Sequence, residues 1–289
     1  MATERLDMTG GLVFRTCRRE MACGERTLIM GILNVTPDSF SDGGSFFSLS
    51  GAVAEGIRLV SSGADLLDIG GESTRPGSDP VTPEEEKERV IPVIRALVKK
   101  IDVPISIDTT KAAVAREAIA AGAEIINDIS ALRFDEDMLP VAAASGAGLI
   151  LMHMRGLPKD MQKGSLYYPS LIEDITAFLE ERLQRALAGG VARENTMLDP
   201  GIGFGKTAAD NMRILKHLAC FRVLGRPILT GMSRKAFIGT VTGGEPRERV
   251  EGTAAALAVA IANGSSVVRV HDVAVMKKVA AMTDAIIRA

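Results

Sequence analysis

Short apolar segments rich in β-branched residues recur along the chain, and each is followed by a longer segment of mixed polarity. They are continuously apolar rather than alternating, as expected of parallel strands covered on both faces. The segments are TLIMGILN (27–34), DLLDIG (65–70), PISIDT (104–109), EIINDI (124–129), GLILMH (148–153), TMLDPG (196–201), PILTGMS (227–233) and SVVRVH (266–271). The pattern predicts eight buried, parallel strands.

The segments between these strands have helical spacing and composition, for example AVAEGIRLVSS, PEEEKERVIPVIRALVKK and SLIEDITAFLEERLQRAL. Pro83 at the start of one segment and Gly122 just past another are typical helix punctuation. A strand followed by a helix, repeated eight times, predicts an α/β fold of the (β/α)8 TIM barrel type. We expect one domain over residues 1–289, with the barrel at 27–289 and residues 1–26 forming a short hairpin that caps its bottom.

Each predicted strand ends in polar residues, and in a (β/α)8 barrel the carboxyl ends of the strands converge on the face that carries the active site. Asp and Asn also end strands because they begin turns and cap helices, so any single one is weak support for a site. The whole set favours one shared opening. Its members are Asn34, Asp68, Asp108, Asn127, His153, Asp199, Ser233 with Lys235, and Arg269 with His271.

Composition excludes several classes of protein. The 34 Lys and Arg against 36 Asp and Glu, with a pI near 6.0, give no basic surface for nucleic acid. Uncharged stretches are too short and too interrupted for a membrane span, and the N-terminus lacks a secretory signal, so we expect a cytoplasmic protein. The cysteines, Cys17, Cys23 and Cys220, are odd in number and lack zinc spacing, which predicts reduced structural thiols.

Two long connections follow the first and second predicted strands, TPDSFSDGGSFFSLS and GESTRPGSDPVTPEE. Both exceed the usual 2 to 6 residues of such connections, and loops of this size are often lids or binding loops. Phe40, Phe46 and Phe47 would let the first loop close over a flat ligand and exclude water. The alternative is that these rings pack on neighbouring helices.

At the predicted opening, Asp108, Asn127, Asp199 and Lys235 combine two carboxylates, an amide and an ammonium. This set suits a heterocycle edged with alternating donors and acceptors, although a purely structural network would also satisfy it. Paired acids are found in glycosidases as well, but a chain with no Trp and only two Tyr lacks the aromatics of a sugar cleft.

Arg269 and His271 alternate on the last strand, so both point to one side, and Asn34 ends the strand expected beside it. An Arg, a His and an amide oxygen that can meet Mg²⁺ would hold a pyrophosphate. Two other glycine-rich segments do not match nucleotide-binding motifs. GFGKT resembles the end of a P-loop, but Pro200 stands where that motif needs its first Gly. GIGFG lacks the third Gly of a dinucleotide-binding loop.

Taken together, these residues resemble the signature segments of the dihydropteroate synthase family, in order, from about residue 28 to the C-terminus. The segments are GILNVTPDSFSDGG (31–44), DIGGESTRPG (68–77), SIDT (106–109), INDIS (126–130), LMHMRG (151–156), LDPGIGFGKT (198–207), SRKAFIG (233–239) and VRVHDV (268–273). The resemblance implies condensation of 6-hydroxymethyl-7,8-dihydropterin diphosphate with 4-aminobenzoate, giving 7,8-dihydropteroate and pyrophosphate in folate biosynthesis. The resemblance also implies that the protein forms a homodimer and that sulfonamides inhibit it.

The resemblance also implies roles for individual residues. Asp108, Asn127, Asp199 and Lys235 would bind the pterin, with Asp68 supporting them. Asn34 would ligate Mg²⁺ and, with Arg269 and His271, hold the diphosphate. The walls around 4-aminobenzoate would be formed by Phe40, Thr74, Arg75, Pro76, Phe204 and Ala236, with Asp42 near the reacting centre.

The implied mechanism is an SN1-like loss of pyrophosphate in which Mg²⁺, Arg269 and His271 stabilise the growing charge and the two loops exclude water. No side-chain nucleophile is needed. One departure concerns Ala236, where many family members have Ser, so only the backbone N–H would meet the aminobenzoate carboxylate.

Three alternatives remain open at this point. A methyltransferase barrel acting on methyltetrahydrofolate would share the pterin array but should lack the SFSDGG and STRPG loops and the SRK lysine. A Schiff-base aldolase could use Lys235 as its nucleophile. A catalytically silent pterin-binding module would need no metal.

Overall fold

The computed structural model describes residues 11–36, 48–73, 78–157, 159–161 and 166–289. Within this described part, eight parallel strands lie in the order β8, β7, β6, β5, β4, β3, β10, β9. A parallel bridge between Leu198 and Ile228 closes the sheet into a barrel. The strands are β3 (Leu28–Asn34), β4 (Leu66–Gly70), β5 (Ile105–Asp108), β6 (Ile125–Asp128), β7 (Gly148–Met152), β8 (Thr196–Asp199), β9 (Leu229–Thr230) and β10 (Val267–Val270). The predicted (β/α)8 fold is confirmed.

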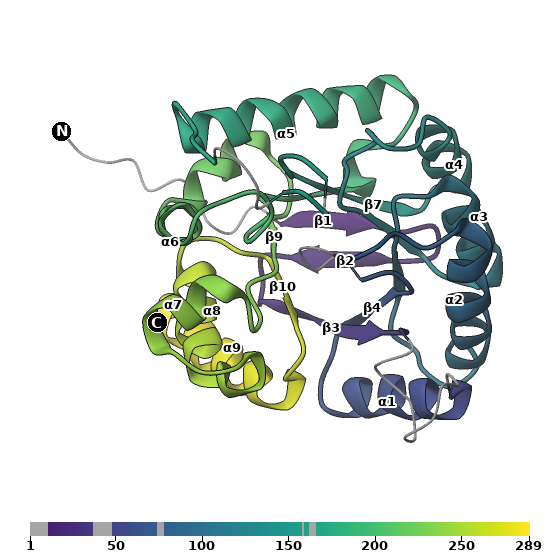
Figure 1. The fold of residues 1–289 in the computed structure, drawn as a ribbon, viewed down its shortest axis with the longest axis horizontal. Helices are drawn as coiled ribbons and strands as arrows, with labels where there is room; N and C mark the ends of the chain where they lie inside the picture. The colour runs from purple at the N-terminus through teal and green to yellow at the C-terminus, as the bar shows by residue number, and fades with distance from the viewer. Residues whose placement is uncertain (1–10, 37–47, 74–77, 158, 162–165) are drawn as a thin grey trace.

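Helices surround the barrel as a ring (Figure 1). They are α1 (Leu49–Ser61), α2 (Pro83–Leu97), α3 (Ala112–Ala121), α4 (Met138–Ser145), α5 (Leu171–Ala188), α6 (Ala208–Lys216), α7 (Ala236–Thr242), α8 (Val250–Ala262) and α9 (Val273–Arg288), with 3-10 turns at Arg193–Asn195, Leu218–Leu224 and Pro246–Glu248. The predicted punctuation is confirmed, because Pro83 opens α2 and Gly122 ends α3 in the left-handed region. No helix in the described residues is long and apolar enough to span a bilayer.

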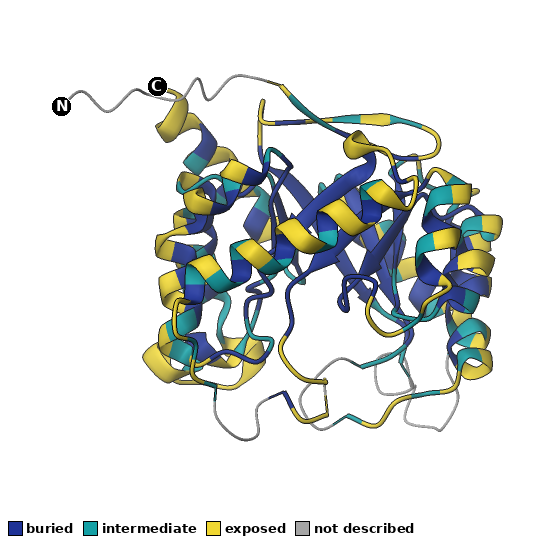
Figure 2. Cartoon of the chain, turned by 90° about the horizontal axis from the view of Figure 1, so that it is seen from above, coloured by how far each residue is buried: buried dark blue, intermediate teal, exposed yellow. Residues whose placement is uncertain are grey.

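A hairpin of β1 (Leu12–Arg15) and β2 (Glu20–Cys23) lies across one end of the barrel (Figure 2). Phe14 is fully buried there, and a Cβ on Gly148 would come within 2.5 Å of its Cζ. Glycine at the start of β7 therefore makes room for the ring. The buried Arg226 donates to the carbonyls of Val13 and Thr196, which anchors the hairpin. The predicted short N-terminal hairpin is confirmed, and its strands span Leu12–Arg15 and Glu20–Cys23.

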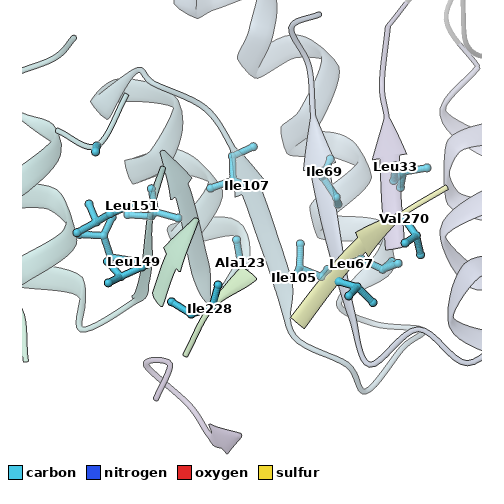
Figure 3. Packing of buried hydrophobic residues seen from close by; sticks show 14 of the residues in the cluster. Leu33, Leu67, Ile69, Ile105, Ile107, Ala123, Leu149, Leu151, Ile228 and Val270 are labelled. Carbon is cyan, nitrogen blue, oxygen red and sulfur yellow. The ribbon is translucent and has the colours of Figure 1, made fainter. Parts of the chain in front are cut away.

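Successive side chains of each strand point alternately inward and outward. Outward residues such as Leu67, Ile69 and Leu149 pack under the helices (Figure 3). Inward residues in the lower part of the barrel form a separate apolar cluster with the hairpin. Its barrel members are Leu28, Met30, Leu66, Ile125, Ile150, Met197, Leu229 and Val267. This floor leaves the polar inward residues above it to line the opening at the carboxyl ends.

The three predicted thiols are all free, and no disulfide links them. Cys23 is buried beside Phe14 in the cluster at the bottom of the barrel, whereas Cys17 and Cys220 are exposed. Burial raises the pKa of the Cys23 thiol to about 12, which disfavours its reactive thiolate form.

Candidate active site

The centre of the opening is a charged cluster in which one guanidinium joins two carboxylates. Arg269, one residue before the end of β10, donates from Nε to Asp68 Oδ2 at 2.6 Å and from a terminal nitrogen to Asp108 Oδ2 at 2.8 Å. Asn127 Nδ2 donates to the same Asp68 oxygen at 3.0 Å. Four strands, β4, β5, β6 and β10, thus contribute to one network.

Burial sets the protonation of this cluster. Desolvation raises the pKa of Asp108 to about 7, an effect that nearby Arg269 opposes and Asp68 reinforces. Desolvation also tends to lower the pKa of Arg269, but Asp68 and Asp108 outweigh it and raise that pKa. The guanidinium is therefore a permanent cation, whereas Asp108 can gain or lose a proton near neutral pH.

Asp199 ends β8, which lies across the barrel from β4, the strand of Asp68. Asp199 also begins the segment 199–206. Its Oδ1 accepts the N–H of Gly201 at 2.7 Å, and burial raises the pKa of the carboxyl. Gly201 has φ of +69°, and a Cβ there would lie 1.8 Å from the carbonyl oxygen of His153. Only glycine fits, so the turn that orients Asp199 requires this residue.

Lys235 lies against this segment. Its Nζ donates to the carbonyl of Ile202 and lies 4.3 Å from the ring centroid of Phe204. Desolvation lowers the pKa of Lys235 to about 7, although the nearby Asp199 carboxylate favours the charged form. The ammonium is therefore held beside a carboxylate and an aromatic face, which suits recognition of a flat polar ring.

The residue before Lys235 is held in an unusual conformation. Arg234 has φ of +61°, in the left-handed region that non-glycine residues seldom adopt. Its guanidinium pairs with both carboxylate oxygens of Asp272 at 3.0 and 2.6 Å, and its N–H donates to Thr253 Oγ1. These contacts from α8 and from the N-cap of α9 fix the turn that positions Lys235.

Ser233 follows β9, His271 follows β10 and Asn34 ends β3, at the place where the sequence predicts a diphosphate site. His271 Nδ1 lies 3.0 Å from Ser233 Oγ, and the His271 N–H also donates to that hydroxyl. Asn34 ends β3 beside β10 and is partly exposed. No group of three His, Cys, Asp or Glu in the described residues is arranged for a metal. A single amide oxygen fits Mg²⁺, which usually keeps waters and substrate phosphates as its other ligands.

One polar strand end does not face the opening. Met152, the last residue of β7, points inward with Ile129 and Phe204, so the next residue, His153, points outward. The His153 ring packs edge-on against Phe178 of α5, at 4.9 Å between centroids. The expectation that all eight ends share one opening is therefore wrong for His153.

Several predicted residues fall outside the described part of the chain. They are Phe40, Asp42, Phe46, Phe47, Thr74, Arg75 and Pro76. Ala236 is exposed at the first position of α7, immediately after Lys235.

Ser106, Arg234 and Asp272 lie at or beside the site, although the sequence did not predict them as site residues. Ser106 lies beside Asp68 on the neighbouring strand, and its Oγ and Asp68 Oδ1 are both buried without a partner among the described residues. Period-two alternation within SIDT could have placed Ser106 inward with Asp108. No local signal marks the pairing of Arg234 with Asp272, because the two are 38 residues apart.

The family model described as pterin binding enzyme matches residues 30–271. A dihydropteroate synthase of Synechocystis sp. is 49% identical over 266 residues, covering 92% of each chain. Two solved dihydropteroate synthases superpose over 96% of this chain. The Yersinia pestis enzyme with a sulfonamide drug has a TM-score of 0.90 at 43% identity and is 100% covered.

The second structure, from Xanthomonas albilineans with 4-aminobenzoic acid, has a TM-score of 0.89 at 44% identity and is 98% covered. Sequence identity at this level, over nearly whole chains with the same barrel, excludes a chance resemblance of the opening in an unrelated protein. The chain belongs to the pterin-binding enzyme family and, within it, to the dihydropteroate synthases.

Proposed function

We propose that the protein condenses 6-hydroxymethyl-7,8-dihydropterin diphosphate with 4-aminobenzoate, forming 7,8-dihydropteroate and releasing pyrophosphate. The single observation that carries this is the buried array of Asp68, Asp108, Asn127 and Arg269, with Asp199 and Lys235 in the same opening. Carboxylates beside an amide and an ammonium offer acceptors and donors for every polar edge of a pterin.

In this proposal the pterin ring is bound mainly through Asp108, Asn127, Asp199 and Lys235. The carboxylates accept from the amino and ring N–H groups, and Lys235 donates to a ring acceptor. Asp68 holds Asn127 and Arg269 in place, since its Oδ2 accepts from both. Buried hydrogen bonds of this kind make recognition strict, because a ring lacking the matching group would leave a charge unpaired.

The diphosphate would extend toward Asn34 and His271, with Arg269 between the ring site and this end. His271 is held by Ser233, and the Arg269 guanidinium carries a positive charge at neutral pH. Asn34 would supply the protein ligand to Mg²⁺. Mg²⁺ bound there would supply neutralisation of the negative charge that builds on the departing pyrophosphate.

Loss of pyrophosphate in an SN1-like step leaves a positive methylene carbon that the electron-rich ring stabilises. The side chains then act only by binding and charge stabilisation, with Arg269 and His271 facing the leaving group. The amine of 4-aminobenzoate attacks the methylene carbon and loses one proton. We place Asp42 near this reacting centre, and the loops that carry Phe40, Thr74, Arg75 and Pro76 around the aminobenzoate.

The aminobenzoate wall within the described residues would be Phe204 and Ala236. The Phe204 ring already lies against the Lys235 ammonium, so a ring bound in front of Lys235 would contact it. Because Ala236 has no hydroxyl, its backbone N–H would be the donor to the carboxylate. Sulfonamides, which copy the shape of 4-aminobenzoate, would compete there, and the relative from Yersinia pestis binds such a drug.

The test is to mix the protein with both substrates and Mg²⁺ and to follow pyrophosphate release. Release should require both substrates and fall when Mg²⁺ is chelated. A control lacking 4-aminobenzoate measures hydrolysis of the diphosphate alone. No release above this control, with folded protein, would refute the proposed reaction.

One observation favours a second candidate, a Schiff-base reaction at Lys235. A desolvated lysine with a pKa near 7 is partly neutral at physiological pH and thus nucleophilic. Borohydride added with a carbonyl substrate would trap an adduct on Lys235 if this chemistry operated. We expect no adduct, because Nζ is engaged as a donor to the carbonyl of Ile202.

We also propose that the protein is a cytoplasmic homodimer. Val259 on α8 and Met282 and Ile286 on α9 are 46%, 63% and 64% exposed, and these two helices pack side by side. Apolar side chains gathered on neighbouring helices support a protein interface, and a second copy of the chain is the occupant we propose.

A further inference from the structure

Lys206 is a buried lysine with no role in the proposed reaction. It does not belong to a phosphate-binding P-loop either, because GFGKT does not match that motif. It belongs to the GFGKT segment, yet its side chain is turned into the protein and is only 2% exposed. Burying an ammonium is costly unless every proton finds an acceptor. Its retention inside the fold therefore calls for a specific set of partners.

Four acceptors lie within hydrogen-bond distance of Nζ, and the carbonyl oxygen of His153, at 3.3 Å, is the most distant of them. Nζ lies 2.8 Å from the carbonyl oxygen of Gly201, 3.0 Å from that of Phe204 and 2.9 Å from His153 Nδ1. Burial lowers the pKa of Lys206 to about 7, against the Asp199 carboxylate, which favours the charged form. In that charged form Nζ can only donate, so Nδ1 accepts and the proton of the neutral imidazole is on Nε2. Burial, and secondarily the charge of Lys206, lowers the pKa of His153 to about 2, which agrees with a neutral ring.

The two carbonyls belong to the segment that forms one wall of the site. The segment 199–206 carries the Asp199 carboxylate, the Ile202 carbonyl that receives Lys235 Nζ, and the Phe204 ring. The Phe204 N–H donates back to the Gly201 carbonyl at 3.1 Å, closing a turn that Lys206 spans. The carbonyls of 201 and 204 thus bind Lys206, while that of 202 binds Lys235.

We propose that Lys206 is a positioning residue for pterin recognition: its ammonium locks residues 201–204 in the turn that holds Asp199, the Ile202 carbonyl and Phe204 around Lys235. This inference rests on the proposed function. Lys206 itself touches neither substrate. Without its ammonium, the carbonyls of Gly201 and Phe204 lose their buried donor, and the turn can relax away from Lys235.

This role predicts a particular pattern of kinetic effects. A misplaced pterin wall weakens binding of the ring, so the KM for the pterin diphosphate should rise by about tenfold or more, as expected for loss of hydrogen bonds from a charged group. At saturating pterin, kcat should change by less than about threefold. A merely structural role would instead lower the folded fraction, which reduces the apparent kcat and leaves KM unchanged.

The experiment compares Lys206→Met with Lys216→Met, which removes an exposed lysine from α6. Methionine keeps the length and apolar stem but has no donor. The probe is 6-hydroxymethyl-7,8-dihydropterin without its diphosphate, titrated by calorimetry in the absence of metal. Lys206→Met should bind it about tenfold more weakly than wild type, and Lys216→Met within twofold. Failure of the wild type to bind would refute the proposed function instead.

A folded Lys206→Met variant whose pterin affinity stays within twofold of wild type would overturn the inference. If that variant does not fold, His153→Phe takes its place, because phenylalanine keeps the ring against Phe178 but removes the Nδ1 acceptor. Because the backbone carbonyls of residues 153, 201 and 204 remain as acceptors, its pterin affinity should fall by only about threefold to fivefold. An unchanged affinity in His153→Phe would overturn the inference equally.

Discussion

Arg269 donates from Nε to a carboxylate oxygen of Asp68 at 2.6 Å, joining residues 201 positions apart in the chain. Asp68 has no exposed surface, and the Arg269 side chain is 20% exposed. Since Asp108 accepts from the same guanidinium, a single cation balances two buried acids. This pairing decides how the ring site is charged before any substrate arrives.

Replacing Arg269 should therefore destabilise the fold as well as the site. Arg269→Met leaves Asp68 and Asp108 buried without their cation, and we expect a loss of about 3 to 5 kcal/mol in urea unfolding. The double variant Arg269→Met with Asp68→Asn should recover part of it. Arg213→Met is the control, because it removes an exposed arginine that pairs with Asp210 on α6. It should lower the free energy of unfolding by less than about 0.5 kcal/mol. Equal losses in the two single variants would contradict this account.

Lys235 and Asn34 should separate binding from turnover. Lys235→Ala removes a half-buried donor, and the affinity for 6-hydroxymethyl-7,8-dihydropterin should fall by about tenfold or more. Asn34→Ala should leave that affinity within about twofold, while turnover slows by about tenfold or more and needs more Mg²⁺. Calorimetry and pyrophosphate release measure the two quantities. Small and equal effects from both would favour a silent pterin-binding module.

The affinity for the pterin should fall both when the pH is lowered and when it is raised from about 7. Burial raises the pKa of Asp108 to about 7, so the acceptor carboxylate is lost as pH falls below 7. Burial lowers the pKa of Lys235 to about 7, so the donor ammonium is lost as pH rises above 7. Affinity measured from pH 5.5 to 9 should peak near 7. Burial lowers the pKa of Lys206 to about 7 as well, so loss of its charge contributes to the same alkaline decline. Lys235→Gln does not titrate in this range and should weaken the decline; an unchanged decline would exclude Lys235 as one of its sources.

Gly201 should be intolerant of any side chain. Its φ is +69°, and a Cβ would lie 1.8 Å from the carbonyl oxygen of His153, so Gly201→Ala must shift the backbone behind Asp199. We expect a loss of more than about 3 kcal/mol, beyond the cost of the left-handed conformation. Gly146→Ala is the matched control, with φ of +63° and open space at Cβ, and should cost only about 1 kcal/mol. Comparable costs in thermal unfolding would disprove the steric argument.

The apolar surface of α8 and α9 should hold two copies together. Light scattering should give twice the 30.6 kDa chain mass for the wild type, and the double variant Val259→Glu with Met282→Glu should return to one chain mass. Val223→Glu, which charges a 77% exposed side chain outside these helices, should leave the mass unchanged. A dimer that survives the double variant would place the interface elsewhere.

Much of the fold follows from local patterns in the sequence. Eight apolar segments separated by helical stretches suffice for the barrel, because buried parallel strands and amphipathic helices each have their own periodicity. Pro83 marks the start of α2, and the sequence predicts a hairpin before the first barrel strand. Nothing local shows that Phe14 fills the barrel floor opposite Gly148. The polar strand ends likewise predicted Asp108, Asn127, Asp199 and Lys235 as neighbours.

Only the tertiary structure decided which of these ends face inward and which groups they meet. Ending β7 at Met152 turns His153 outward, because alternation reverses direction at every residue. Closure of the barrel brings Arg269 to Asp68 and Asp108, and the turn at Gly201 brings Lys206 to His153. A sequence pattern records periodicity along one strand. Partners across the barrel depend on register and on burial, which exist only once all eight strands have closed.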